Sequence, residues 1–422
     1  MSTQLSLLQL IWMAVQLIEW AFHEFLRLLQ VTPEEIVAIL IVPILIDMPR
    51  SIGKAIFLLL HGLYSRLTPR SEVDVKPMVS VIVPAHNEEE VIERTIKSLL
   101  KQDYPNREII VVDDGSTDRT YEIASKFAER GLIKLVHRER ASGKKARAVN
   151  YGFLYSKGDI IVTVDADTVL EPHTLSELVK PFSNPDVGAV SGNVRVMNRV
   201  NLLTRLQAYE YLMAMEMGRR FQAISGMLMI IPGALGAVRR RIAESLGLYD
   251  PDTMTEDFDI TLKIHKTRMK VRFAPEAIGW TTVPESWCAW VKQRMRWTAG
   301  QLQTLIKHRN VFFRRYFKTI GLIATPDMLL MDIILLFVRA TWLIALPLFY
   351  FRLIPQIFIL TSLFYMLNEL VIAAAAAVLS PRRRDLIYVP LVPIVVLFYR
   401  PLYGLVRMKA YMEALAGREF KW

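Results

Sequence analysis

Three groups of polar side chains in the first half of the chain each follow a short apolar run. They are His86-Asn87-Glu88 after residues 79–84, Asp113-Asp114 after residues 108–112, and Asp165-Ala166-Asp167 after residues 159–164. Ligands of open α/β sheets bind beyond the carboxyl ends of the strands, so these groups are placed to share one edge. Each group could instead cap a helix or make a turn, but three at one edge favour a binding site.

The most specific of these groups is the pair Asp165 and Asp167, two carboxylates with one residue between them. Just past a strand, such a pair can hold a hard divalent cation, Mg²⁺ or Mn²⁺, with diphosphate oxygens as its other ligands. Gly143-Lys144-Lys145 opens a predicted helix and adds cations near a helix N-terminus, which suits phosphate, although alone it is more simply a solvated basic turn. Its spacing is not that of a P-loop, which argues against a Walker-type ATPase.

A second acidic pair, Glu256-Asp257, follows a turn and precedes a predicted helix at residues 258–266. The pair could simply cap that helix. In a chemical role, Asp257 would be the general base that takes a proton from an acceptor hydroxyl, opposite a departing diphosphate. A basic group would then be needed to stabilise the charge of the diphosphate.

Residues 286–307 predict an amphipathic helix with two distinct faces. One face carries Gln293, Arg296, Trp297 and Gly300 at positions i, i+3, i+4 and i+7. The other face is mostly apolar and suits a membrane interface or the underside of a domain. An amphipathic surface helix explains only the apolar face. An amide for sugar hydroxyls, a guanidinium for diphosphate and an aromatic plane for a sugar ring would together make an acceptor site.

The segment that must position these groups alternates between strand and helix patterns. Short β-rich runs occur at residues 79–84, 108–112, 132–136 and 159–164, and helical patterns lie between them at 91–100, 117–130 and 143–156. Continuous apolar strands separated by helices predict a mostly parallel α/β sheet covered on both faces.

Apolar residues make up 52% of the 422-residue chain and are concentrated at its two ends. Residues 5–22 can span a membrane, and 36–64 form either one long bent span or a short span followed by an interfacial helix. Three later stretches, 329–351, 357–379 and 386–405, also approach or reach spanning length. We therefore expect membrane or interfacial helices over 1–75, the α/β domain over 76–280, an interfacial segment over 281–320, and membrane helices with a cytosolic tail over 321–422.

Charge predicts which side of the membrane the domain faces. The formal net charge is +11, and most of the excess lies just before the C-terminal apolar stretches. Basic clusters beside a bilayer favour its cytoplasmic side, so the domain, the loop at 381–384 and the tail should all be cytoplasmic. Three spans after the domain would put the tail outside, so one apolar stretch must be interfacial or re-entrant. A membrane is a better partner than nucleic acid, for which no motif is present, and the single cysteine excludes an intramolecular disulfide.

Taken together, these motifs resemble the family 2 inverting glycosyltransferases, and most closely their membrane-bound, processive branch of cellulose, chitin, hyaluronan and poly-N-acetylglucosamine synthases. The matched segments cover about residues 77–300 in the family's order: Pro84-Ala85-His86-Asn87-Glu88-Glu89, Asp113-Asp114-Gly115-Ser116, Gly143-Lys144-Lys145-Ala146, Asp165-Ala166-Asp167, Thr255-Glu256-Asp257 and Gln293-Arg294-Met295-Arg296-Trp297. The last fits Q-x-x-R-W without substitution. No motif of a cellulose-synthase gating loop follows it, which makes the chain more similar to the poly-N-acetylglucosamine or hyaluronan synthases.

The resemblance implies a GT-A-like fold, a UDP-sugar donor, Mg²⁺ or Mn²⁺, and a polysaccharide or lipid acceptor at the plasma membrane. It assigns catalysis to Asp257 with Glu256, the metal to Asp165 and Asp167, and the acceptor to Gln293, Trp297 and Gly233. The donor would contact Pro84, Asn87, Glu88, Asp113, Asp114, Lys144, Lys145, Asp165, Arg294 and Arg296.

Two other functions remain open from the sequence. The chain could add one sugar to a membrane lipid, because some single-transfer enzymes also carry Q-x-x-R-W. More remotely, it could be a membrane protein that only senses nucleotide sugars, although Asp257 would then have no role. A dehydrogenase is disfavoured because no Gly-x-Gly-x-x-Gly follows the first strand.

Overall fold

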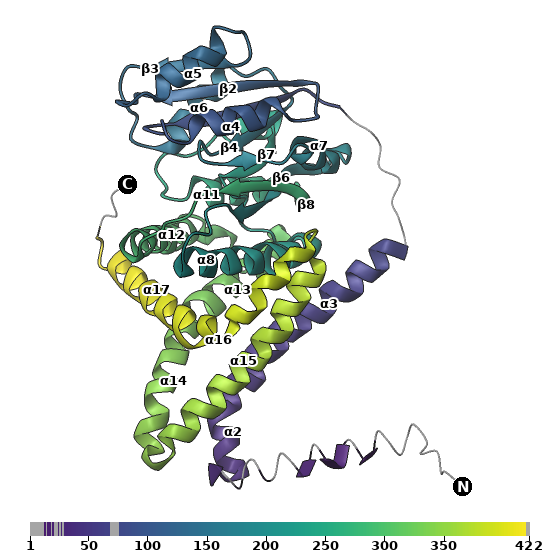
Figure 1. Ribbon diagram of the computed structural model, residues 1–422, viewed down its shortest axis with the longest axis vertical. Helices are drawn as coiled ribbons and strands as arrows, with labels where there is room; N and C mark the ends of the chain where they lie inside the picture. Colours follow the sequence, from purple (N-terminus) through teal and green to yellow (C-terminus); the bar gives the residue numbers. More distant parts are fainter. Residues whose placement is uncertain are drawn as a thin grey trace.

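The computed structural model describes residues 29–67 and 76–418, and before them positions 12, 13, 15–17, 19, 20, 24 and 27. The span predicted at residues 5–22 lies largely outside the described residues, as does the end of the tail, and both stay predictions. Figure 1 shows the α/β domain at one end of the molecule, with the long helices α3, α14 and α15 extending away from it.

The first half of the domain follows the predicted alternation of strands and helices. In chain order it contains β1, α4, β2, α5, β3, α6 and β4: Val79–Ala85, Ile92–Leu100, Arg107–Asp114, Thr120–Ala128, Lys134–Arg138, Lys145–Leu154 and Ile160–Val164. β1 pairs in parallel with β2 and β4, and β2 pairs in parallel with β3. β1 and β4 are buried on both faces almost throughout, as the continuous apolar runs require. The predicted segments are confirmed.

The second half of the domain adds strands that the sequence analysis did not predict. They are β5 (Val169–Leu170), β6 (Val187–Val196), β7 (Leu235–Arg239) and β8 (Lys270–Thr281). The strand order among the described residues is β3-β2-β1-β4-β7-β6-β8-β5. β7 runs antiparallel to β4 and β6, and β5 runs antiparallel to β8. The sheet is therefore mixed but mostly parallel, and the expected α/β class is correct.

Helices cover both faces of the sheet. Alternating strand residues point to opposite faces, so Val81 packs with Ile96 of α4 in one apolar core, whereas Ile82 packs with Val149 of α6 in another. The second core also includes Ile260 of α11 (Glu256–Lys266). Figure 1 places α8 (Leu202–Leu212) and α12 (Trp287–Lys307) as a layer between the sheet and the long helices. The N-terminus of α11 is thereby held between sheet and α12.

Within the described residues, four helical stretches are long and apolar enough to cross a membrane, judged by length and composition: Pro33–Ser65, Ile320–Phe349, Phe351–Leu379 and Arg384–Leu415. They contain or overlap the predicted stretches. Pro33–Ser65 joins α2 (Pro33–Val42) to α3 (Met48–Leu67) through a π-helical turn at Pro43–Asp47. Of the two interpretations of this region, one long continuous helix is the one that the structure contains.

Polar residues interrupt the apolar pattern of α3 because they face neighbouring helices. Arg50 Nη1 lies 2.5 Å from Asp327 Oδ1, and Asp47 is paired with Arg339 and Tyr365. Charged groups in a membrane are costly unless they find such partners. Arg50 thus ties α3 to α13 (Thr325–Asp327), and Asp47, which directly precedes α3, reaches α14 (Leu335–Phe349) through Arg339 and α15 (Ile354–Leu379) through Tyr365.

The last apolar stretch does not extend away from the domain with the others. Tyr399 and Tyr411, which bracket most of α17 (Arg400–Leu415), contact α12 at two points. Trp290 Nε1 donates to Tyr399 Oη at 3.0 Å, and Tyr411 Oη donates to Gln301 Oε1 at 2.9 Å. Figure 1 shows this stretch bent around α16 (Val392–Ile394), with α17 returning beside α12. That this stretch is the interfacial or re-entrant segment stays a prediction.

Candidate active site

The carboxyl ends of β1 and β4 bring Glu88, Asp165 and Asp167 together. Glu88 follows β1, and its backbone N–H donates to Thr120 Oγ1 at 2.7 Å. Burial, followed by the negative charges of Asp167 and Asp165, raises the pKa of Glu88 to about 7. Carboxyl groups this close disfavour one another's ionisation, so the cluster calls for a cation.

Three threonine hydroxyls orient the carboxylate of Asp167. Thr281 Oγ1 donates to Oδ1 at 3.1 Å, Thr282 Oγ1 donates to Oδ2 at 2.5 Å, and Thr168 Oγ1 donates to Oδ1 at 3.2 Å. Hydrogen bonds of this kind favour the charged form, but burial and the charge of Asp165 still raise the pKa of Asp167. The carboxylate of Asp167 is therefore held in one orientation, but its surroundings supply too little positive charge to keep its pKa at the usual value.

Lys145 supplies positive charge between the two acidic pairs. Its Nζ forms an ion pair with Asp165 Oδ1 and lies 3.8 Å from Glu256 Oε1. Burial alone would lower the pKa of Lys145, but these carboxylates hold the pKa above its usual value. A Cβ at Gly233 would lie only 2.5 Å from Lys145 Nζ, so the absence of a side chain there leaves room for the ammonium group. The structure thus brings together residues that are far apart in sequence.

Glu256 and Asp257 open α11 at the edge of this group. Withdrawal from water raises the pKa of Glu256 to about 7 and also raises that of Asp257. α12 fixes their position by close packing, because a Cβ at Gly300 would meet Thr255 Cγ2 at 2.6 Å. Thr255 Oγ1 also lies 3.0 Å from Thr304 Oγ1 of α12. The predicted helical face containing Gly300 therefore packs against Thr255, the residue directly before the acidic pair.

The basic residues of α12 divide between two environments. Burial lowers the pKa of Arg296, and the negative charges of Glu256, Asp165 and Asp257 act on its guanidinium in the opposite direction. Arg294 is not brought to these carboxylates. Its side chain is fully buried and donates to Glu210 Oε2 at 2.8 Å.

Arg294 instead supports the two residues assigned to the acceptor. It donates to Gln293 Oε1 at 2.7 Å, and its guanidinium lies 4.4 Å from the centre of the Trp297 ring. Tyr399 Oη donates to the same oxygen of Glu210, at 2.5 Å, that pairs with Arg294. The sequence analysis placed Arg294 with the donor, and the structure places it beneath Gln293 and Trp297.

The remaining predicted donor residues lie along the ends of β1 and β2, in contact with their own neighbours. Asp113 is fully buried and lies 2.7 Å from His137 Nδ1 of β3. Asp114 accepts from Ser142 Oγ at 2.5 Å and pairs with Arg138 at 3.0 Å. Asn87 Oδ1 accepts from the Thr117 N–H at 2.8 Å, Pro84 lies partly buried in β1, and Lys144 caps α6.

Among the residues that the structure describes, no group of three His, Cys, Asp or Glu side chains is arranged to hold a metal ion by itself. Asp165 and Asp167 would provide two hard oxygen ligands, as the chemistry of Mg²⁺ or Mn²⁺ requires, and a diphosphate would have to provide more. A cation, the ammonium of Lys145, already lies against Asp165. These ligand atoms suit a metal ion that is bound together with a diphosphate, and they do not suit a metal ion alone.

Sequence reasoning missed Thr281, Thr282, Glu210 and Arg219. Thr281 is the last residue of β8 and Thr282 follows it; the pattern of this strand was not recognised, so nothing placed them near Asp167. Glu210 and Arg219 lie on helices beneath the sheet, and their partners are distant in sequence. Arg219 is partly buried, donates to the Ile230 carbonyl oxygen, and carries a charge that opposes the rise in the pKa of Asp257.

Residues 80–247 match the family model described as glycosyl transferase family 2. This part of the chain is a family 2 glycosyltransferase domain. The match contains the strand ends that carry Glu88, Asp165 and Asp167. The acidic pair at Glu256-Asp257 and the Q-x-x-R-W segment of α12 lie beyond it.

Two curated relatives extend the comparison. A probable glycosyltransferase of Bacillus subtilis, YdaM, is 38% identical over 262 residues, which are 60% of this chain and 62% of that protein. A poly-β-1,6-N-acetyl-D-glucosamine synthase of Staphylococcus epidermidis is 32% identical over 242 residues, 57% of this chain and 58% of that protein. The chain therefore matches about three fifths of the length of these relatives.

A solved structure with a similar fold is that of a mannosyltransferase from Pyrobaculum calidifontis, in complex with GDP-Man and Mn²⁺. The TM-score is 0.56 at 22% sequence identity, and the match covers 91% of this chain and 100% of the other. At this identity the likeness concerns the fold alone. The GT-A-like fold expected for the glycosyltransferase domain is confirmed.

Proposed function

We propose that the chain is a membrane-bound inverting glycosyltransferase. It would transfer a sugar from a UDP-sugar, UDP-GlcNAc or UDP-Glc, to a growing β-linked polysaccharide and move the product across the bilayer. The observation that carries the proposal is the position of Lys145, which joins Asp165 to Glu256, beside the proposed base Asp257. The similarity to a poly-β-1,6-N-acetyl-D-glucosamine synthase supports a polysaccharide product.

The reaction would be a single displacement at the anomeric carbon. Asp257 accepts the proton of the acceptor hydroxyl as the oxygen attacks, and the bond between the anomeric carbon and the diphosphate oxygen breaks. Lys145 and Arg296 lie where they would stabilise the charge of the departing UDP. A Mg²⁺ or Mn²⁺ ion held by Asp165 and Asp167, when bound, would neutralise further charge on the diphosphate. Gln293 and Trp297, supported by Arg294, would hold the acceptor sugar.

The test is UDP release by the purified full-length protein with each UDP-sugar and Mn²⁺ or Mg²⁺, followed by sizing of the labelled product. Long chains from UDP-GlcNAc or UDP-Glc are expected. GDP-mannose is included because the mannosyltransferase of similar fold was solved with GDP-Man and Mn²⁺. Release of GDP from GDP-mannose, with no UDP released from any UDP-sugar, would overturn the UDP-sugar proposal, and absence of nucleoside diphosphate release from every donor would overturn enzymatic transfer.

A second candidate function is transfer of a single sugar to a membrane lipid. It is favoured by an open apolar pocket on the side of one helical stretch, Ile320–Phe349, lined by Ile333, Ile334, Phe337, Val338, Thr341 and Trp342. Such a surface suits an acyl or polyprenyl chain. A lipid-soluble product carrying one sugar, with no longer chains, would decide for this function.

A further inference from the structure

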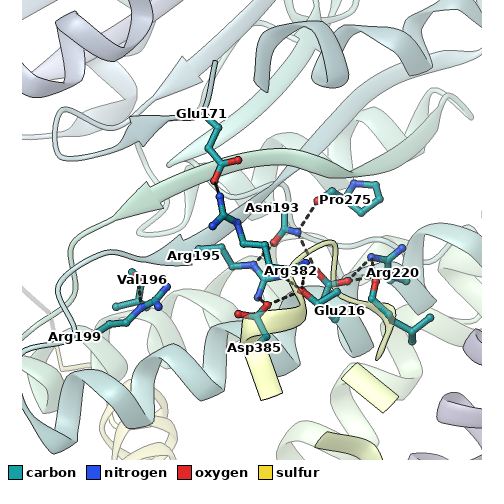
Figure 2. A network of polar contacts seen from close by, with 12 residues as sticks. Glu171, Asn193, Arg195, Val196, Arg199, Glu216, Arg220, Pro275, Arg382 and Asp385 are labelled. Carbon is teal, nitrogen blue, oxygen red and sulfur yellow. Dashed lines mark hydrogen bonds and ion pairs between the residues drawn. The ribbon is translucent and has the colours of Figure 1, made fainter. Parts of the chain in front are cut away.

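A buried polar network fastens the loop after α15 to the sheet (Figure 2). Arg195 of β6 lies at its centre: Nη1 donates to Asp385 Oδ2 at 3.0 Å, and Nη2 donates to Glu216 Oε1 at 2.5 Å. Ser380 Oγ also donates to Asp385, at 2.5 Å. The loop at residues 380–385 thus joins the membrane-side helix α15 to the glycosyltransferase domain.

Arg382 of the same loop reaches a different part of the sheet. Its guanidinium forms an ion pair with Glu171 Oε1 and lies 4.8 Å from the centre of the Trp280 ring. Trp280 Nε1 donates to the same glutamate oxygen at 2.8 Å. Glu171 follows β5, and Trp280 is paired with Val169 of β5. Arg382 therefore holds the point where β5 meets β8.

That point lies next to the proposed metal ligand. Trp280 is followed directly by Thr281 and Thr282, whose hydroxyls hold both oxygens of Asp167 at 3.1 and 2.5 Å. Asp167 in turn precedes β5 by one residue, Thr168. Arg382 is therefore connected to Asp167 by a short path. It runs from Arg382 to Trp280 by direct contact, along the backbone to Thr281 and Thr282, and from their hydroxyls to the carboxylate of Asp167 by hydrogen bonds.

The two ion pairs of this loop differ in how exposed they are, which suggests different roles: one fastens the loop to the domain, and the other positions residues of the sheet. Arg195 and Asp385 are nearly inaccessible, with 5% and 8% of their side chains exposed, so their pair suits the fastening of the loop. Arg382 and Glu171 retain 40% and 28% exposure. A pair this exposed contributes little to stability, yet it can still set where Trp280 and the following threonines lie.

We infer that Arg382 is a positioning residue for the metal–diphosphate site. It acts through Trp280 and Thr282 on the carboxylate of Asp167, so the seating of the loop after α15 sets how well that carboxylate meets the metal-bound diphosphate. This inference rests on the proposed function. Groups that orient a metal ligand without touching the metal typically change its affinity about 10- to 100-fold.

The experiment measures binding of UDP to the full-length protein in nanodiscs by titration calorimetry, with and without Mn²⁺. Arg382→Ala and Thr282→Val are each expected to weaken Mn²⁺-dependent UDP binding about tenfold. UDP binding without Mn²⁺ should stay as in the wild type, because the path ends at a metal ligand. Arg384→Ala is the matched control, since Arg384 is an exposed arginine of the same loop.

A double variant tests the path itself. If Arg382 acts through Thr282, the combined substitutions weaken Mn²⁺-dependent binding no more than the stronger single one. Effects that multiply, or Mn²⁺-dependent binding by Arg382→Ala equal to that of the wild type, overturn the inference.

Melting of each variant is recorded in parallel, and Glu171→Gln replaces Arg382→Ala if the latter does not fold. A lowered melting temperature with unchanged Mn²⁺ dependence would show a merely structural role. If the wild-type protein itself binds no UDP with Mn²⁺, the proposed function fails, and that result is distinct from failure of the variants alone.

Discussion

The ammonium group of Lys145 lies against Asp165 and 3.8 Å from Glu256, so one lysine connects the acidic pair after β4 with the acidic pair that opens α11. Lys144, its neighbour in the sequence, makes no such contact and caps α6. The two lysines were assigned to the donor together, and the structure separates them.

The first prediction follows from this separation. Lys145→Ala removes the charge proposed to stabilise the departing diphosphate and should lower the rate of UDP release by about 10²-fold. Lys144→Ala is the control and should change the rate little. Steady-state UDP release from both variants is the measurement, and equal losses from the two would contradict the assignment of Lys145.

The second prediction concerns pH. A general base must be ionised to act, and withdrawal from water raises the pKa of Asp257 and takes that of Glu256 to about 7. The rate of UDP release should therefore fall at acid pH, beginning above the ordinary range of an aspartate carboxyl, and level off at higher pH. Glu256→Gln removes a negative charge that faces Asp257, so the fall in rate at acid pH should begin at a lower pH than in the wild type.

Asp257→Asn accompanies this profile and should lower the rate about 10²- to 10⁴-fold on the high-pH plateau, with a smaller loss at acid pH, where the wild-type aspartate is itself protonated. Asp252→Asn serves as its control because Asp252 is an exposed residue of the preceding turn. If the rate of Glu256→Gln falls at the same pH as that of the wild type, a group other than this acidic pair determines the pH dependence.

Much of the domain could be predicted from sequence because its first half is regular. The runs around Val81 and Val162 are apolar apart from Ser80 and Thr163, and such runs are typical of buried parallel strands. β8 could not be recognised in this way, since Pro275 and Glu276 break its pattern and a register shift accommodates them. Missing β8 meant missing Thr281 and Thr282.

The residues of the candidate site also differ in how well the sequence could predict them. Asp165, Asp167 and Asp257 could be named because local motifs mark them, and the geometry of parallel strands brings their segments to one edge. The role of Arg294 could not be predicted, because its partner Glu210 lies 84 residues away in the sequence. The position of Glu210 depends on how α8 packs beneath the sheet. Spacing on a helix shows which residues share a face, and it does not show what that face meets.

The third prediction tests that interpretation of Arg294. Removing one partner of a buried ion pair leaves the other charge unpaired, at a cost of about 3–5 kcal/mol. Arg294→Ala should therefore lower the melting temperature of the protein markedly, as should Glu210→Ala. Lys292→Ala, an exposed position on the same helix, should not. Normal melting together with a raised KM for the donor would instead support direct contact of Arg294 with the donor.

The last prediction concerns the side of the membrane on which each segment lies. Arg382 and Asp385 contact the glycosyltransferase domain, which places the loop after α15 on the side of the domain. α17 then runs along α12, as the contact of Tyr411 with Gln301 shows, so the tail should return to that side as well. The turn between α14 and α15 lies at the opposite end of the long helices (Figure 1).

Single cysteines can test this arrangement once the exposed native Cys288 is replaced by serine. Phe351→Cys, in the exposed turn between α14 and α15, should react with a membrane-impermeant maleimide in intact cells. Ala416→Cys, just past α17, should react only after the membrane is opened, because its side of the bilayer is that of the basic loop. Labelling of Ala416→Cys in intact cells would mean that Arg384–Leu415 crosses the bilayer, and α17 could then not remain beside α12.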